Sequence, residues 1–170
     1  VHAGLAGGAD IILIPERPFD LDEVAEVILA RHAIGKDFSI VVVAEGAAVK
    51  TSDHVGPVIA DGDEKKVDEF GHVRLGGVGH YLAREIEKRT GFETRVTVLG
   101  HIQRGGTPTA RDRILATLFG VKAHDLVRDG RFGMMAAMVG GRIDAVPIKE
   151  AIREVKSVDM EFFHVAEIFF

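Results

Sequence analysis

The sequence contains no cysteine and no tryptophan, and only one of its 170 residues is tyrosine. Without cysteine, the chain can form neither a disulfide framework nor a thiolate nucleophile. It also lacks a signal-peptide pattern and any apolar run near the roughly 18 residues at which a membrane-spanning helix would be suspected. These absences lead us to expect a cytoplasmic protein that is not inserted in a membrane.

An excess of positive charge is also missing, because acidic residues outnumber basic ones and the formal net charge is -5 at pH 7. Surfaces that bind nucleic acid are usually basic, so we expect no nucleic-acid partner. The eight histidines show neither an HExxH motif nor a short paired spacing, so we expect no metal site built by this chain. What remains, 46% hydrophobic and 28% charged residues, suits a globular chain that buries a core.

Apolar strands and amphipathic helices alternate along the chain. The segment 11–14 is typical of a short buried strand, and 20–34 of a helix that begins at an Asp20 cap and ends at Gly35. Further helices are predicted at 78–90, 109–119, 121–128 and 147–156, and further strands at 39–44, 94–99, 134–139 and 143–146. This alternation predicts an α/β fold with a parallel sheet, in which ligands bind beyond the carboxyl ends of the strands.

A polar, glycine-punctuated stretch at 46–77 interrupts this alternation, and we expect no core residues from it. Long connections of this kind are often functional. A solvated excursion is the favoured interpretation, and the alternative is an ordered hairpin at an interface.

The stretch Thr94–Pro108, TRVTVLGHIQRGGTP, joins a predicted strand to a predicted helix through a glycine-rich basic loop. Gly100 allows the chain to turn, and the Gly105–Gly106 pair allows the backbone to approach a ligand closely. Thr107–Pro108 suits the cap and first position of the next helix, whose free amides would then face the loop. The geometry is suited to holding a phosphate.

Side-chain donors gather in the same loop. Arg104 offers a planar, permanently charged fork to two phosphate oxygens, and His101 adds a donor whose charge can follow pH near neutrality. Arg95 supplies a second guanidinium. The sequence therefore predicts a phosphate site here, and the alternative is a plain strand-to-helix turn that carries surface charges.

The run TRVTVLGHIQRGG, followed by TP and DRILAT, resembles the 6-phosphofructokinases where they hold fructose 6-phosphate. Supporting stretches are GLAGGADIILIPE, GKDFSIVVVAEGA and LAREIEKRTGFETR, which follow one another in the family's order. The resemblance implies the three-layer Rossmann-like parallel sheet of the phosphofructokinase fold, truncated to its carboxy-terminal half. The family's donor loop, its catalytic aspartate in a TIDND-like motif and its MGR motif are absent, so no catalytic residue is expected in this chain.

The resemblance also implies a domain organisation. Residues 1–102, including the excursion at 46–77, would form the sugar-phosphate-binding lobe. Residues 103–147 would be the returning part of an incomplete phosphoryl-donor lobe, and 148–170 a tail that rejoins the sugar-phosphate lobe.

Roles for single residues follow from the same resemblance. The loop residues that match the family's fructose 6-phosphate contacts are His101, Ile102, Gln103 and Arg104. Arg95 matches an arginine that reaches into a neighbouring subunit's site in the family tetramer, and Glu45 matches a glutamate that accepts hydrogen bonds from sugar hydroxyls. Each is therefore a predicted substrate-binding residue.

A second set of residues aligns with the site of an allosteric nucleotide diphosphate in regulated family members. These residues are Gly8, Asp10 and Lys36. Ile34 and Asp37, however, stand where the family usually has basic side chains, so we expect altered or absent activation. Surface charges flanking strands are the alternative interpretation of Asp10 and Lys36.

The function implied by the resemblance is phosphoryl transfer to the 1-hydroxyl of fructose 6-phosphate by a homo-oligomer, with Mg²⁺ and either ATP or pyrophosphate as donor. Donor and metal would be held mainly by the missing amino-terminal half, and this half alone would be inactive. An alternative of another class is a non-catalytic module for sugar-phosphate binding or oligomerisation.

Overall fold

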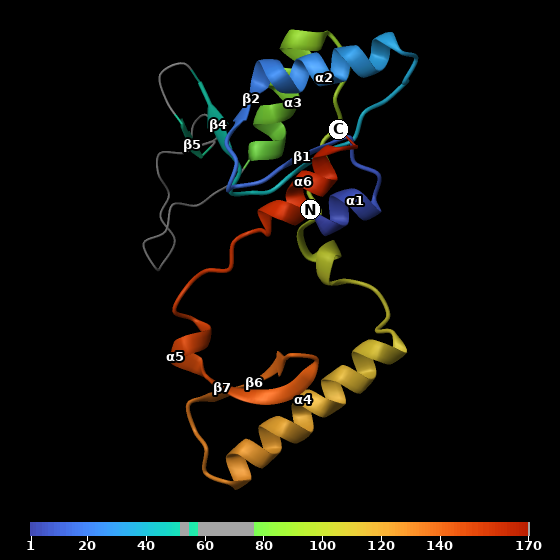
Figure 1. The fold of residues 1–170 in the computed structure, drawn as a ribbon. Coiled ribbons are helices and arrows are strands. Elements are labelled where there is room, and N and C mark those ends of the chain that lie inside the picture. The colour runs from blue at the N-terminus through green and yellow to red at the C-terminus, as the bar shows by residue number, and fades with distance from the viewer. Residues whose placement is uncertain (52–54, 58–76, 170) are drawn as a thin grey trace. The chain divides into compact units, whose positions relative to one another are not determined.

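The computed structural model describes residues 1–51, 55–57 and 77–169 (Figure 1). The chain divides into two compact units, one made of Val1–Val98 with Val158–Phe170 and the other of Leu99–Ser157. The lobe boundaries predicted from the sequence lie after residues 102 and 147, whereas the chain passes from one unit to the other after Val98 and after Ser157. Each unit has its own secondary structure and is described separately.

The first unit is built around two parallel strands. Strand β1 (Ile11–Leu13) follows helix α1 (His2–Ala6) and pairs in parallel with β3 (Val41–Val43), from Ile11 opposite Val41 to Leu13 opposite Val43. Helix α2 (Leu21–Ala33) connects the two strands, so this is a strand–helix–strand unit. The predicted α/β fold with parallel strands is confirmed.

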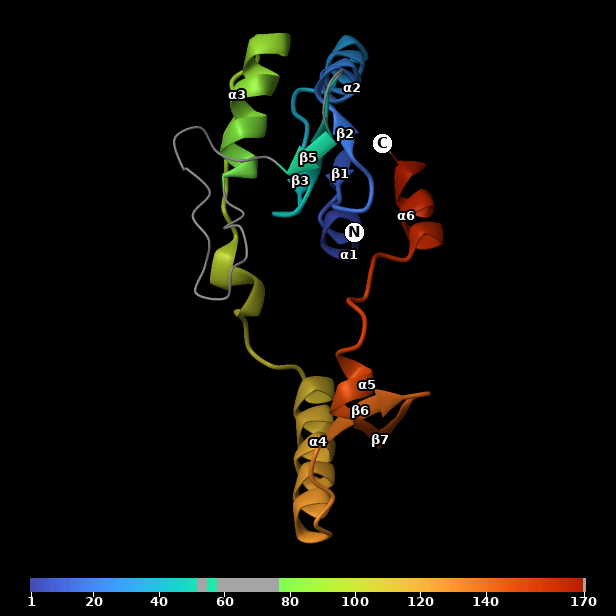
Figure 2. The same ribbon diagram turned by 90° about the vertical axis from the view of Figure 1, so that its left-hand side faces the viewer.

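The side chains of β1 alternate between two clusters, which makes the first unit three-layered. Ile11 and Leu13 pack with α2 and α3 (Val78–Thr90), while Ile12, together with Ile14 just beyond the strand, packs with Phe163 of α6 (Met160–Glu167). Successive residues of a strand face opposite sides of a sheet, so one short strand serves both layers. Figure 2 shows β1 between α3 and α6.

A second sheet in the first unit has three strands, β2 (Phe19–Asp20), β4 (Ala48–Lys50) and β5 (Val55–Pro57), in that order. Strands β4 and β5 are antiparallel and fall inside the predicted excursion. Residues 52–54 and 58–76 of that prediction lie outside the described residues. The expectation that this stretch contributes nothing to the core is wrong, because Ala47 is fully buried in the cluster around α2 and α3.

Local signals place the ends of α2 and α3 correctly. The Asp20 carboxylate caps α2 by accepting a hydrogen bond from the Asp22 amide at 2.8 Å. Beyond the last turn, Gly35 has a φ of 85° and its amide donates to the His32 carbonyl, while the Lys36 amide donates to Arg31. This pair of bonds is a Schellman motif, which satisfies carbonyls that the helix leaves free.

Gly91 ends α3 in the left-handed region, with a φ of 74°. An added Cβ would meet no atom within 4 Å, so the cost of Gly91→Ala comes from the backbone alone. We expect this substitution to lower the free energy of unfolding by about 1 kcal/mol in a urea titration. The matched control is Gly120→Ala inside a helix, also in open space, which should raise stability by up to about 1 kcal/mol. Equal effects of the two substitutions would contradict the argument.

The second unit packs one long helix on a hairpin. Helix α4 (Ala110–Arg128) contacts β6 (Met134–Val139) and β7 (Arg142–Pro147), which are antiparallel. The predicted Gly140–Gly141 turn is confirmed, with φ values of 55° and 81° that favour glycine at both positions. A short helix α5 (Ile148–Ala151) follows the hairpin.

Three predictions about elements are wrong. Residues 94–99 form no strand, and the Thr94 amide instead donates to the Glu87 carboxylate at 2.7 Å. The two helices predicted around Gly120 are one helix, because a single glycine costs only about 1 kcal/mol. The helix predicted at 147–156 is confined to α5, and α6 was not predicted.

Candidate functional site

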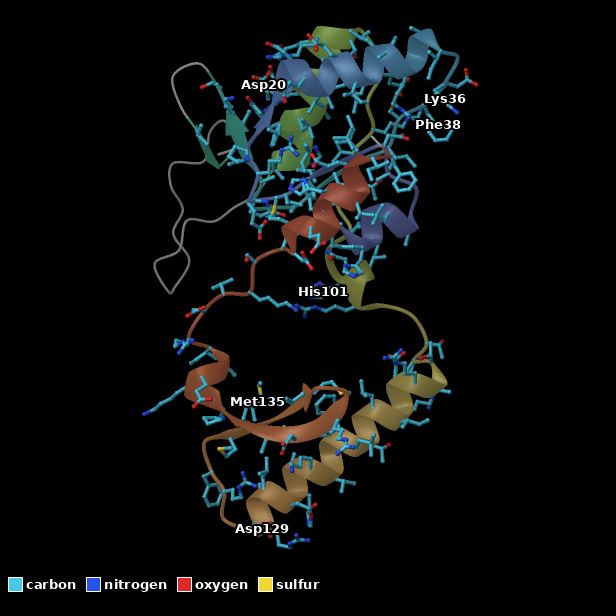
Figure 3. The ribbon with its side chains drawn as sticks, in the orientation of Figure 1. Asp20, Lys36, Phe38, His101, Asp129 and Met135 are labelled. Carbon is cyan, nitrogen blue, oxygen red and sulfur yellow. The ribbon has the colours of Figure 1, made fainter. Side chains whose placement is uncertain are left out.

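The predicted phosphate loop lies in the second unit and begins with a short 3₁₀ helix, Gly100–Arg104. The Ile102 amide donates to the Leu99 carbonyl at 2.9 Å, and the Gly105 amide donates to the Ile102 carbonyl at 3.0 Å. This tight turn leaves the predicted loop residues exposed, including His101, which is labelled in Figure 3, and Arg104. Their polar groups are available to a ligand.

Glycine is required by the backbone at several points of this loop. Gly100 and Gly106 have φ values of 49° and 100°, where other residues are strained. A Cβ on Gly105 would come within 3.2 Å of the Ile102 carbonyl oxygen. The glycines therefore shape the turn itself, in addition to any close approach to a ligand.

The start of α4 differs from the prediction. Thr109, not Thr107, is the N-cap, and the helix begins at Ala110, not at Pro108 and one residue after the start of the predicted 109–119 helix. Thr109 and Asp112 form a capping box, in which the Asp112 carboxylate accepts from the Thr109 amide at 2.8 Å and the Thr109 hydroxyl accepts from the Asp112 amide at 3.2 Å. Hydrogen bonds from the amide and hydroxyl of Thr109 lower the pKa of Asp112, so its carboxylate stays ionised.

The spacing Thr-x-x-Asp was the signal for this cap. The sequence correctly predicts Asp112 in the first helical turn and a helix over 109–119, but it assigns the cap to Thr107 because Thr107–Pro108 also fits a helix start. The capping box sets the start of α4 at Thr109, because its two residues satisfy the backbone amides at two positions.

Glu45 lies in the first unit, directly beyond β3. The Ala44 amide donates to the Leu13 carbonyl at 2.9 Å, and a turn then closes from the Ala47 amide to the Ala44 carbonyl. The Glu45 side chain is exposed at the carboxyl end of the parallel pair. Open α/β sheets bind ligands at this end of their strands, and the sequence predicted that Glu45 would lie there.

Arg95 is exposed in the first unit, with 87% of its side chain accessible. Its Nε lies 3.1 Å from a carboxylate oxygen of Glu93, which is also exposed. Exposed pairs contribute about 1 kcal/mol or less, so Arg95 can leave Glu93 for another anion at little cost. Because Glu45 and Arg95 belong to one unit and residues 101–104 to the other, their joint contact with one ligand stays a prediction.

Within the described part of the chain, no group of three or more histidine, aspartate or glutamate side chains could hold a metal ion. None of the described helices has both the length and the apolar character needed to cross a membrane.

The phosphofructokinase family model matches residues 1–127, which is most of the chain and includes every predicted site residue. The chain belongs to the phosphofructokinase family. It is 50% identical over 170 residues to a pyrophosphate–fructose 6-phosphate 1-phosphotransferase of Streptomyces coelicolor, covering 100% of this chain and 48% of that protein. It is 47% identical over 170 residues to an ATP-dependent 6-phosphofructokinase of Mycobacterium tuberculosis, with the same two coverages.

Solved structures agree with this family assignment. The chain matches the phosphofructokinase of Pichia pastoris in the T-state with a TM-score of 0.63 and 35% identity, covering 89% of this chain and 15% of that one. The phosphofructokinase fold is therefore confirmed, and the chain spans about half the length of the curated relatives it matches.

The residues predicted for an effector site lie in the first unit in different environments. Gly8 has a φ of 67°, and Lys36 is exposed after the Gly35 turn (Figure 3). Asp10 is not the surface charge of the alternative interpretation, because only 9% of the residue is exposed. Sequence reasoning missed its partners: one carboxylate oxygen lies 2.5 Å from Arg31 Nη2, and the other accepts from the Ile40 amide at 2.7 Å.

Proposed function

We propose that this chain supplies the fructose 6-phosphate site of a 6-phosphofructokinase, which transfers a phosphoryl group to the 1-hydroxyl and forms fructose 1,6-bisphosphate. The observation that carries the proposal is the exposed His101 and Arg104 on a glycine-bounded 3₁₀ turn, inside the segment that matches the family model. The permanently charged guanidinium of Arg104 and the neighbouring imidazole of His101 can both donate hydrogen bonds to a phosphate dianion.

In this proposal the chain binds and orients the substrate. Arg104 and His101 hold the 6-phosphate, with Ile102 and Gln103 completing the loop. Glu45 accepts hydrogen bonds from sugar hydroxyls, and Arg95 serves the site of a neighbouring subunit in a homo-oligomer. Binding energy from the remote phosphate then positions the reacting hydroxyl, which can carry a large share of catalysis. The phosphoryl donor, Mg²⁺ and the general base would be held or supplied by the amino-terminal half of the enzyme, which this sequence does not contain. We also propose that the enzyme is cytoplasmic.

Pyrophosphate is a second candidate donor beside ATP. Three pyrophosphate-dependent relatives are 50 to 52% identical to this chain, whereas ATP-dependent relatives are 43 to 47% identical. The donor-binding residues that would decide between the two are not in this half of the family's sequence.

The first test is calorimetric titration of the 170-residue chain with fructose 6-phosphate. We expect saturable binding of fructose 6-phosphate and none of fructose, which lacks the phosphate. No heat from either sugar would contradict the proposal. Turnover is expected with neither ATP nor pyrophosphate, and turnover with either would exclude the non-catalytic module and identify the donor.

A second measurement separates half of an enzyme from a non-catalytic module. Sequencing the coding DNA upstream of Val1 is expected to show a continuous reading frame with a glycine-rich donor loop and a TIDND-like motif. A start signal at Val1 would favour the binding module instead.

A further inference from the structure

The amide, hydroxyl and carbonyl of Thr109 all form hydrogen bonds at the point where the loop joins α4. Its amide and its hydroxyl both donate to the same oxygen of Asp112 at 2.8 Å. The hydroxyl accepts from the Asp112 amide, and the Thr109 carbonyl accepts from the Arg113 amide at 3.1 Å. The backbone of Thr109 is therefore tied to the first turn of the helix by every polar group it has.

The segment between Arg104 and Thr109 needs such an anchor. Two of its four residues are Gly105 and Gly106, which have more conformational freedom than any other residue type. On its amino-terminal side the segment is held by the bond from the Gly105 amide to the Ile102 carbonyl. Without the capping box the first turn of α4 would fray, and the loop would lengthen at its carboxyl-terminal side.

Asp112 also decides which groups of the loop are open to an anion. Its carboxylate already occupies the Thr109 amide and places a negative charge at the positive end of α4. The Thr109 hydroxyl likewise occupies the Asp112 amide, so neither of these two amides is free for a sugar phosphate. The expectation that free helix amides would face the ligand does not hold for these two.

From these contacts we propose that Thr109 and Asp112 are positioning residues, which fix the loop end so that His101 and Arg104 are ordered before the sugar phosphate binds. The inference rests on the proposed function, because it concerns the same ligand. Neither side chain contacts the substrate in this proposal. Their effect is to remove the cost of ordering the loop on binding.

The test compares Thr109→Val, which removes the hydroxyl without changing charge, with Thr109→Ser, which keeps it. We expect the Kd for fructose 6-phosphate to rise about fivefold in Thr109→Val, the ratio that corresponds to the loss of a typical helix cap. In Thr109→Ser it should stay within about twofold of wild type. Binding is measured well below the thermal midpoint, so that a purely structural role would lower Tm without changing Kd.

Asp112→Ala is compared with Asp144→Ala, which removes the same charge from the same unit. Asp144 accepts from its neighbour Ala145 and from Lys122, and it has no part in the loop. We expect weaker binding in Asp112→Ala than in Asp144→Ala, although loss of a negative charge alone would favour an anionic ligand.

Amide hydrogen exchange of residues 105–111 without ligand separates failure of this inference from failure of the proposed function. Faster exchange in Thr109→Val than in Thr109→Ser is expected. Unchanged exchange, or an unchanged Kd in Thr109→Val, overturns the positioning role. If wild type binds no fructose 6-phosphate, the proposed function fails, and the role in positioning that ligand fails with it.

Discussion

Arg104→Ala is expected to weaken binding of fructose 6-phosphate at least tenfold. A hydrogen bond to a charged group contributes about 1.5 to 3 kcal/mol, and every 1.4 kcal/mol changes a Kd about tenfold. Arg104 is exposed on the 3₁₀ turn, and no ion pair within the described part of its own unit holds its guanidinium. The loss should therefore appear in the affinity for the sugar phosphate and not in the stability of the unit.

The measurement is calorimetric titration of the chain, and in a full-length enzyme the KM for the sugar phosphate. Arg104→Lys should give an intermediate Kd, because an ammonium keeps the charge but loses the planar fork. The control is Arg142→Ala on β7, which removes an exposed arginine from the same unit outside the loop. Equal affinities of wild type and Arg104→Ala, or an equal loss in Arg142→Ala, would disprove the assignment.

Much of the fold could be predicted where the signals are local. The ends of α2 depend on Asp20 and Gly35, and the end of α3 on Gly91, each within a few residues of the helix. The β6–β7 hairpin depends in the same way on the Gly140–Gly141 pair. Caps and tight turns are readable from sequence because their hydrogen bonds close over short distances along the chain.

Where an element depends on distant partners, the sequence-based predictions were wrong or incomplete. Residues 94–99 have the β-branched composition of a strand, but a strand also needs a neighbour, and Glu87 of α3 takes the Thr94 amide. Helix α6 is buried through Phe163 and Ala166 against β1, which lies far away in sequence. Propensity cannot report such packing, since tertiary contacts routinely override it.

In the candidate site, too, local features could be predicted from the sequence and contacts between distant residues could not. The turn at Gly100 could be predicted, and Gly100 has the positive φ that such a turn requires. The pairing of Asp10 with Arg31 could not, because those residues meet only when α2 packs on the sheet. For the same reason, sequence could align Asp10 with an effector contact but could not show that its carboxylate is already in use.

Asp10→Ala is expected to lower the free energy of unfolding by about 3 kcal/mol. The substitution leaves the Arg31 guanidinium without its anion, with 22% of that side chain exposed, and leaves the Ile40 amide without the Asp10 carboxylate. Removing one member of a buried ion pair typically costs about 3 to 5 kcal/mol. The low end applies here because Arg31 keeps a hydrogen bond to the Ser39 hydroxyl at 3.3 Å.

The matched control for Asp10 is Asp22→Ala, which breaks the contact between Asp22 and Arg89 at 2.7 Å. The Asp22 side chain is 78% exposed, so this change should cost about 1 kcal/mol or less. Both variants are measured by urea titration at the same pH. Similar costs for the two would show that the Asp10 pair is no stronger than a surface pair.

The same variant tests the predicted effector site. Because both oxygens of Asp10 are engaged inside the first unit, a nucleotide diphosphate that used this carboxylate would have to break the Arg31 contact or the Ile40 contact. A ligand that binds only the folded chain raises its stability, so binding of ADP would appear as an increase in Tm. We expect no such increase in wild type, which also lacks basic side chains at Ile34 and Asp37. An increase that disappears in Asp10→Ala but persists in Asp22→Ala would instead make Asp10 an effector ligand, and its pairing with Arg31 the unliganded state of that site.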